Sequence, residues 1–102
     1  MDRIEQLRKF IAASPDEPFP RYALALELKG KGDVVAAAAE MAELIGRKPD
    51  YLAAYLMQGM MLQSLGRAEE AKDIYRRGQD LARKTGDSKA LSELTQALET
   101  LG

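Results

Sequence analysis

The chain has 102 residues, 46% of them hydrophobic and 30% charged, which suffices for one domain with a single core and is too short for two. Fifteen basic and sixteen acidic residues are interspersed, and the net charge of −1 excludes an overall field that attracts nucleic acid or anionic lipid. The chain has no cysteine and no histidine, which excludes disulfide bonds and thiolate metal sites and removes the usual general base at neutral pH. We therefore expect no metal, no cofactor and no enzymatic activity.

Two stretches bear on localisation. The N-terminal residues include acids and a base before any apolar run, which is not the pattern of a secretory signal. The stretch 51–66 has no charged residue, but its sixteen residues are fewer than the ~20 apolar residues of a membrane-spanning helix. We expect a cytoplasmic protein that does not bind a membrane; the earlier removal of a signal sequence stays open.

The first two predicted helices are bounded by acidic residues and turn formers. Asp2 has the spacing of a helix cap, and apolar residues then recur at helical intervals until Pro15 ends the helix. Asp16 is expected to cap the second helix, which has prolines in its first turn and ends at Gly30 and Gly32.

The next two predicted helices follow the same rules. Asp33 is expected to cap a third helix that Gly46 and then Pro49 end. Asp50 is expected to cap the fourth helix, which contains the charge-free stretch and stops at Gly66.

The last two predicted helices are amphipathic. The fifth begins near Arg67 and ends at Gly86, and Asp87 or Ser88 caps the sixth. The sixth helix carries a single apolar stripe, made of Leu91, Leu94, Leu98 and Leu101. No segment alternates with a period of two, so we expect an all-α protein without strands.

An internal repeat appears when the chain is shifted against itself by 34 residues. Matching residues then coincide in pairs: Ala25 with Gly59, Leu28 with Leu62, Gly32 with Gly66, Ala37 with Ala71, Met41 with Tyr75, and Pro15 with Pro49. These residues resemble the tetratricopeptide repeat, a helix-turn-helix unit with this period. Small residues in this pattern allow close helix approach, and a large neighbour such as Tyr55 or Tyr75 fills the adjacent space.

The resemblance is closer in the second copy than in the first. The second copy matches the family's slots with Tyr55, Gly59, Leu62, Ala71 and Tyr75, and the first with Leu24, Ala25, Leu28, Ala37, Met41 and Pro49. Three residues depart from the pattern: Arg21 replaces an aromatic residue, Gln58 a leucine and Arg83 the closing proline.

The resemblance implies an architecture of about six antiparallel helices in a short right-handed superhelix. The expected organisation is a single domain over 1–102, with an N-terminal half-repeat helix at 2–14, repeats at 16–49 and 50–84, and a C-terminal capping helix at 87–101.

The resemblance also implies a function, because first helices of such repeats line a concave groove that usually holds a partner peptide or helix. One residue along from the internally packed face is a turn of ~100°, which selects the groove face. The expected partner-binding residues are Tyr22, Leu26, Lys29, Leu56, Met57, Met60 and Gln63. Methionine in such a surface suits adaptable apolar recognition. A terminal-carboxylate clamp is not expected, because only Lys29 supplies a cation.

Competing readings of these residues stay open or are disfavoured. The sixth helix covering Met60 is as good an expectation as an open groove. The cluster of Arg76, Arg77, Arg83 and Lys84 lies among acids and reads as a solvated helix face, not a phosphate site. Acids on open faces, such as Glu40 and Glu43, lack the burial that would tune a catalytic pKa.

The predicted function is a non-catalytic module for protein–protein interaction, with a protein or peptide partner and no nucleic acid. The alternative is a homo-oligomerising assembly subunit, possible as a homodimer, that uses an apolar edge of the first helix formed by Ile4, Leu7, Phe10 and Ile11. An RNA-binding helical repeat is a third candidate, disfavoured by the 34-residue period, the balanced charge and the apolar groove slots.

Overall fold

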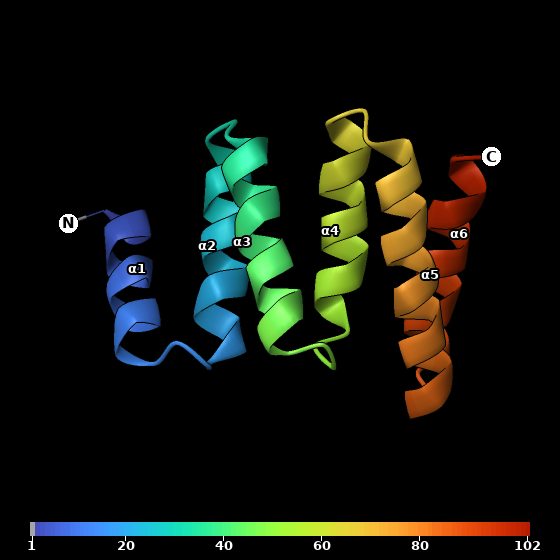
Figure 1. The fold of residues 1–102 in the computed structure, drawn as a ribbon, viewed down its shortest axis with the longest axis horizontal. Coiled ribbons are helices and arrows are strands. Elements are labelled where there is room, and N and C mark those ends of the chain that lie inside the picture. The colour runs from blue at the N-terminus through green and yellow to red at the C-terminus, as the bar shows by residue number, and fades with distance from the viewer. Residues whose placement is uncertain (1) are drawn as a thin grey trace. The chain divides into compact units, whose positions relative to one another are not determined.

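The computed structural model describes residues 2–102, and all regular elements in that range are α-helices (Figure 1). The chain divides into two compact units, one reaching to Pro49 and the other covering Asp50–Gly102. None of the helices in residues 2–102 is long and apolar enough to cross a bilayer.

The first unit contains three helices: α1 (Arg3–Ala13), α2 (Pro18–Gly30) and α3 (Val34–Arg47). Helix α2 packs against both α1 and α3. The core is apolar, as the helical spacing of its residues predicts, and comprises Leu7, Leu24, Ala25, Leu28, Ala37, Met41, Leu44 and Ile45.

The second unit also contains three helices: α4 (Ala53–Ser64), α5 (Ala68–Thr85) and α6 (Ser88–Thr100). Helix α5 packs against α4 and α6, which makes it the central helix of this unit. The core consists of residues from all three helices: Ala54, Tyr55, Met61, Leu62, Ala71, Tyr75, Ala82 and Leu94.

The turns inside the two helix pairs repeat at the backbone level. Gly32 and Gly66 both take the left-handed conformation, with φ of +87° and +76°, which a residue with a side chain rarely adopts. The residue after each glycine donates its N–H to a leucine carbonyl in the preceding helix, Asp33 to Leu28 and Arg67 to Leu62, both at 2.9 Å. This is the helix-ending arrangement in which left-handed glycine satisfies unpaired carbonyls.

Three predicted caps are confirmed. The carboxylates of Asp2, Asp33 and Asp87 each accept the backbone N–H three residues further on, at 2.9, 3.1 and 3.0 Å. Each carboxylate thus satisfies one of the backbone donors that a helix N-terminus leaves unpaired.

Two predicted caps are wrong. Glu17, not Asp16, precedes α2, and no side chain caps that helix, because Pro18 at its start has no N–H to satisfy. Asp50 does not cap α4, which begins three residues later, at Ala53. The carbonyls of Tyr51 and Leu52 accept the first N–H groups there instead, at 3.1 Å each.

The predicted end of the third helix is also wrong by one residue. Gly46 does not take a left-handed φ and lies inside α3, which continues to Arg47. A glycine ends a helix only where it adopts that conformation, and here the chain leaves the helix at Lys48, just before Pro49.

Candidate functional site

The inner face of α4 shows why its small residue is required. A Cβ atom at residue 59 would lie within 2.6 Å of the ring carbons Cδ1 and Cζ of Tyr75, so only glycine lets the ring pass. Tyr75 is fully buried, and its hydroxyl donates to Oε1 of Gln63 at 3.1 Å. This burial raises the pKa of Tyr75 above its usual value, because water no longer stabilises the phenolate.

The outer face of α4 carries the predicted partner-binding residues of the second unit. Leu56 and Met57 are half-buried, whereas Met60 is 43% exposed and Gln63 is exposed. Met60, Gln63 and Ser64 line an open hollow of about 350 Å³. The Gln63 carbonyl is already occupied by Tyr75, which leaves its amide N–H groups for other contacts.

The outer face of α2 carries the predicted residues of the first unit. Tyr22 is half-buried, Leu26 is 37% exposed, and Lys29 is exposed in the last turn, where a cation favours the helix dipole. Leu26 and Met60 are 34 residues apart, so the same repeat slot exposes a large apolar side chain in each unit. The predicted set therefore divides between the units, with Tyr22, Leu26 and Lys29 in the first and Leu56, Met57, Met60 and Gln63 in the second.

Helix α6 leaves Met60 open. Leu94 of α6 is buried, and its methyl carbons would lie 3.1 Å from a Cβ atom placed on Gly78 of α5. Thr95 accepts a hydrogen bond from Nε2 of Gln79 of α5 at 3.0 Å. The alternative in which the sixth helix covers the Met60 face is therefore wrong, because α6 directs its buried stripe mainly to α5.

Arg21 shows how the first repeat replaces the aromatic residue of its slot. The side chain is buried, and its Nη1 donates to the carbonyl of Pro15 at 2.8 Å. Its Nε lies 3.5 Å from Oε2 of Glu40, close enough for an ion pair but without hydrogen-bond geometry. Arg21 thus joins the turn before α2 to α3, a role that its charge concealed at the sequence level.

The other charged side chains mostly pair along their own helices. Arg47 pairs with Glu43 at 2.8 Å, and Arg83 with Asp80 at 3.3 Å. Arg77 lies over the ring of Tyr55, 5.7 Å from its centroid. Among residues 2–102 no three potential metal-ligating side chains come together.

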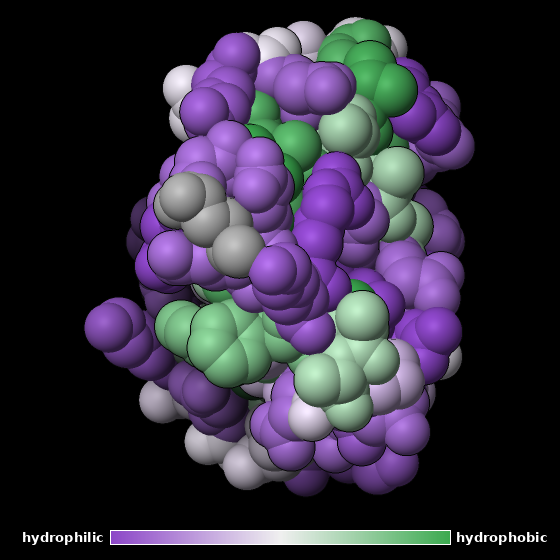
Figure 2. Space-filling model, turned by 90° about the vertical axis from the view of Figure 1, so that its left-hand side faces the viewer, coloured by the Kyte–Doolittle hydropathy of each residue, from purple (hydrophilic) through white to green (hydrophobic). Residues whose placement is uncertain are grey.

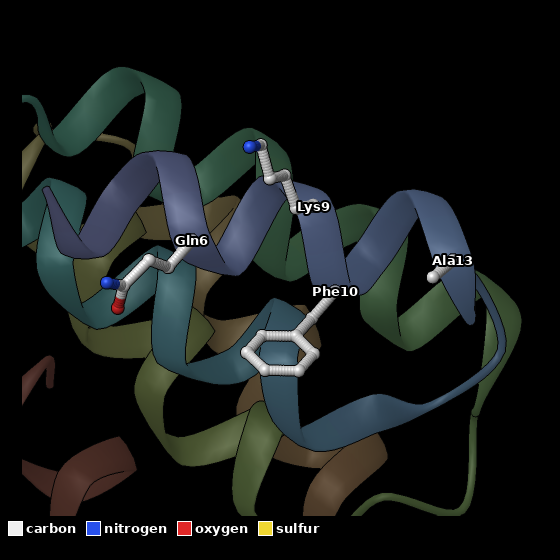
Figure 3. A pocket seen from close by; sticks show the side chains of 4 residues that line it. All are labelled: Gln6, Lys9, Phe10 and Ala13. Carbon is white, nitrogen blue, oxygen red and sulfur yellow. The ribbon is translucent and has the colours of Figure 1, made fainter. Parts of the chain in front are cut away.

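The outer face of α1 has an apolar region that the sequence described only in part. Leu7 is buried against α2 and does not belong to the predicted edge, whereas Phe10 is 63% exposed. Phe10 lies in an open hollow of about 460 Å³ that Gln6, Lys9 and Ala13 also line. Figure 2 shows apolar patches among polar side chains on this side of the molecule, and in Figure 3 Gln6 and Phe10 project on the same side of α1 while Lys9 points away.

Comparisons with known proteins identify the family. A tetratricopeptide repeat domain protein from Salinibacter ruber is 38% identical in its crystal structure, with a TM-score of 0.78 over 83% of this chain and 94% of that one. Its solution structure gives a TM-score of 0.80 over 86% and 89% of the two chains. A protein from Bordetella parapertussis, 24% identical, shares the fold with a TM-score of 0.82 over 99% and 88%. No protein-family model and no curated protein sequence matches the chain.

The chain belongs to the tetratricopeptide repeat family. The predicted all-α repeat fold is thereby confirmed. Members of this family are helical repeat modules generally used for protein–protein interaction and are typically non-catalytic.

Proposed function

We propose that this chain is a non-catalytic interaction module that binds an apolar segment of a partner protein, a peptide or a helix, on the outer faces of its first helices. In the first unit the binding residues are those of α2, Tyr22, Leu26 and Lys29. In the second unit they are those of α4, Leu56, Met57, Met60 and Gln63.

One observation carries the proposal. Leu26 and Met60 occupy the same slot of the two repeats, and both expose a large apolar side chain, whereas their neighbours Ala25 and Gly59 are buried. Exposing an apolar side chain to water costs about 25 cal/mol for each Å² that could be buried. A slot that bears this cost in both repeats is explained by a partner that covers it.

The side chains suggest how the partner is held. Burial of the partner's apolar groups against Met60 and Leu26 supplies the free energy, and the flexible thioether of Met60 adapts to different shapes. Lys29 and the free amide of Gln63 orient the partner through polar contacts. So small a surface supports an affinity in roughly the micromolar range.

A peptide selection tests this proposal. Peptides selected from a displayed library on the wild-type chain are titrated against Met60→Glu, which places a charge in the centre of the α4 face. We expect binding at least about tenfold weaker, because a buried carboxylate without a partner costs several kcal/mol. Circular dichroism checks that the helices are retained.

Val35→Glu is the matched control, because Val35 is 66% exposed but lies on α3, away from the proposed faces. Its affinity for the selected peptides should equal that of the wild type. Peptides that bind Met60→Glu and Leu26→Glu as tightly as the wild type would refute the proposed surface.

A further inference from the structure

The Phe10 face of α1 corresponds to a face that another helix covers in both complete repeats. Phe10 is 34 residues before Leu44, which is 1% exposed, and 68 residues before Gly78. A Cβ atom on Gly78 would lie 2.8 Å from Cβ of Tyr55, a residue of the first helix of that repeat. The exposed ring of Phe10 therefore lies where a first helix belongs, and in residues 2–102 no helix covers it.

Helix α6 is a first helix without a second helix among the described residues. Its buried central residue, Leu94, aligns with Gln58, the buried central residue of α4. In this register the face that α4 turns toward its second helix, Tyr55, Gly59 and Leu62, corresponds in α6 to Leu91, Thr95 and Leu98. These α6 residues are only half-buried, whereas their α4 counterparts are buried.

Space is available beside this α6 face. A hollow of about 290 Å³ adjoins Leu91 and is lined by residues at the junction of α5 and α6, among them Ala82, Gly86 and Ser88. An apolar side chain from another helix would fill space there that protein atoms leave open.

The charges of the two helices are complementary. Helix α1 carries three basic residues and one acidic residue, namely Arg3, Arg8, Lys9 and Glu5. Helix α6 carries one basic residue and two acidic residues, namely Lys89, Glu93 and Glu99. Attraction between opposite charges favours an α1–α6 pair over an α1–α1 pair, in which like charges would meet.

We propose that α6 of one copy docks antiparallel on the Phe10 face of α1 of a second copy, so that the two helices complete a repeat across the molecules. The contact joins two different surfaces, so it is heterologous and each copy keeps one free surface of each kind. It buries less than a standard protein interface, and association is therefore weak and rises with concentration. This inference goes beyond the proposed peptide binding, which uses α2 and α4.

Cysteine cross-linking tests the contact directly, because the chain has no cysteine of its own. The observed approach of Tyr55 to Gly78 places residue 91 of one copy next to residue 10 of the other. Mixing the variants Leu91→Cys and Phe10→Cys under mild oxidation should give a one-to-one mixed disulfide dimer. The double variant should give a ladder of higher oligomers on denaturing gels.

Val35→Cys mixed with Leu91→Cys is the control for random collision, since Val35 is exposed on α3. A yield no higher than in this control overturns the proposal. So does a dominant Phe10→Cys homodimer, which indicates α1–α1 packing, or a double variant that closes only within one chain.

Sedimentation of cysteine-free chains gives an independent measurement. The average mass of the wild type should rise with concentration, and Phe10→Glu should stay at the monomer mass while retaining its helices. A wild-type chain that stays monomeric up to about 1 mM, a range in which even weak contacts associate, contradicts the proposal.

Discussion

Individual side chains set how closely the helices of each repeat approach. In the second repeat Gly59 lies under the ring of Tyr75, and in the first repeat Ala25 and Met41 occupy the same two slots. A smaller residue on one helix is thus matched by a larger one on the other, so the summed volume in the slot pair is nearly kept. These slots are determined by packing and are independent of any partner.

Gly59→Ala is expected to destabilise the protein although alanine favours helices by about 1 kcal/mol over glycine. The added methyl group overlaps the ring of Tyr75, and overpacking costs typically about 1–3 kcal/mol. Urea unfolding measures the difference. Gly46→Ala is the control, because no atom lies within 4 Å of its new Cβ, and it should gain about 0.5–1 kcal/mol.

The double variant Gly59→Ala with Tyr75→Met reproduces the pair found in the first repeat. We expect it to recover part of the stability that Gly59→Ala loses, which gives a favourable coupling energy in a double-mutant cycle. Additive losses would mean that the ring of Tyr75 is not what excludes a side chain at residue 59.

Gln58→Leu is expected to stabilise the protein by about 1–2 kcal/mol, because it removes a buried acceptor without a partner. Oε1 of Gln58 accepts no hydrogen bond from the described residues, and Leu24 is fully buried in the equivalent slot. Gln79→Leu is the control, since Gln79 donates to Thr95 and its loss should destabilise. A lower urea midpoint for Gln58→Leu would show that its amide makes a necessary contact.

The helices differ in how their first turns are satisfied. Helices α1, α3 and α6 begin with an aspartate that caps the first turn, whereas α2 and α4 begin without any side-chain cap. Helix α4 also lacks a charged residue to favour its dipole, so its stability depends on burial of its inner faces.

Asp87→Ala is therefore expected to cost about 1 kcal/mol of unfolding free energy, because the N–H of Ala90 loses its acceptor. Asp50→Ala should have little effect, since Asp50 caps no helix. Thermal unfolding followed by circular dichroism compares the two variants. Equal losses would mean that the turn before α4 needs Asp50 for a reason other than capping.

For the chain as a whole, charge is balanced globally and locally. Fifteen basic residues face sixteen acidic ones, and arginines such as Arg47 and Arg67 bond to acids of their own helices, Glu43 and Glu70. The bond from Arg67 lowers the pKa of the Glu70 carboxyl. Cations that are paired in this way are not gathered into a surface that attracts polyanions.

A titration with single-stranded RNA tests this charge distribution. We expect no binding beyond a weak non-specific level at about 50 mM salt, because binding to phosphates requires clustered cations that release counterions. Binding that weakens steeply as salt increases would restore the RNA-binding alternative.

The fold could be predicted largely from local signals in the sequence. Asp33 caps a helix because its carboxylate reaches an N–H three residues away, and Gly66 ends one because glycine accepts a positive φ. Such signals need only near neighbours along the chain, and the 34-residue spacing of Gly59 and Ala25 then revealed the repeat. Asp50 failed as a cap because carbonyls of the following turn satisfied the same donors.

Exposure could not be predicted in the same way, because it depends on which helix covers which face. Phe10 and Leu7 have the same helical spacing signal, yet Leu7 is buried on α2 and Phe10 is open. Met60 is open because α6 packs mainly on α5, and Arg21 is buried because a carbonyl and Glu40 come within its reach. The sequence by itself determined the helices, their repeat and the family; only tertiary packing decided which apolar side chains stay available to another molecule.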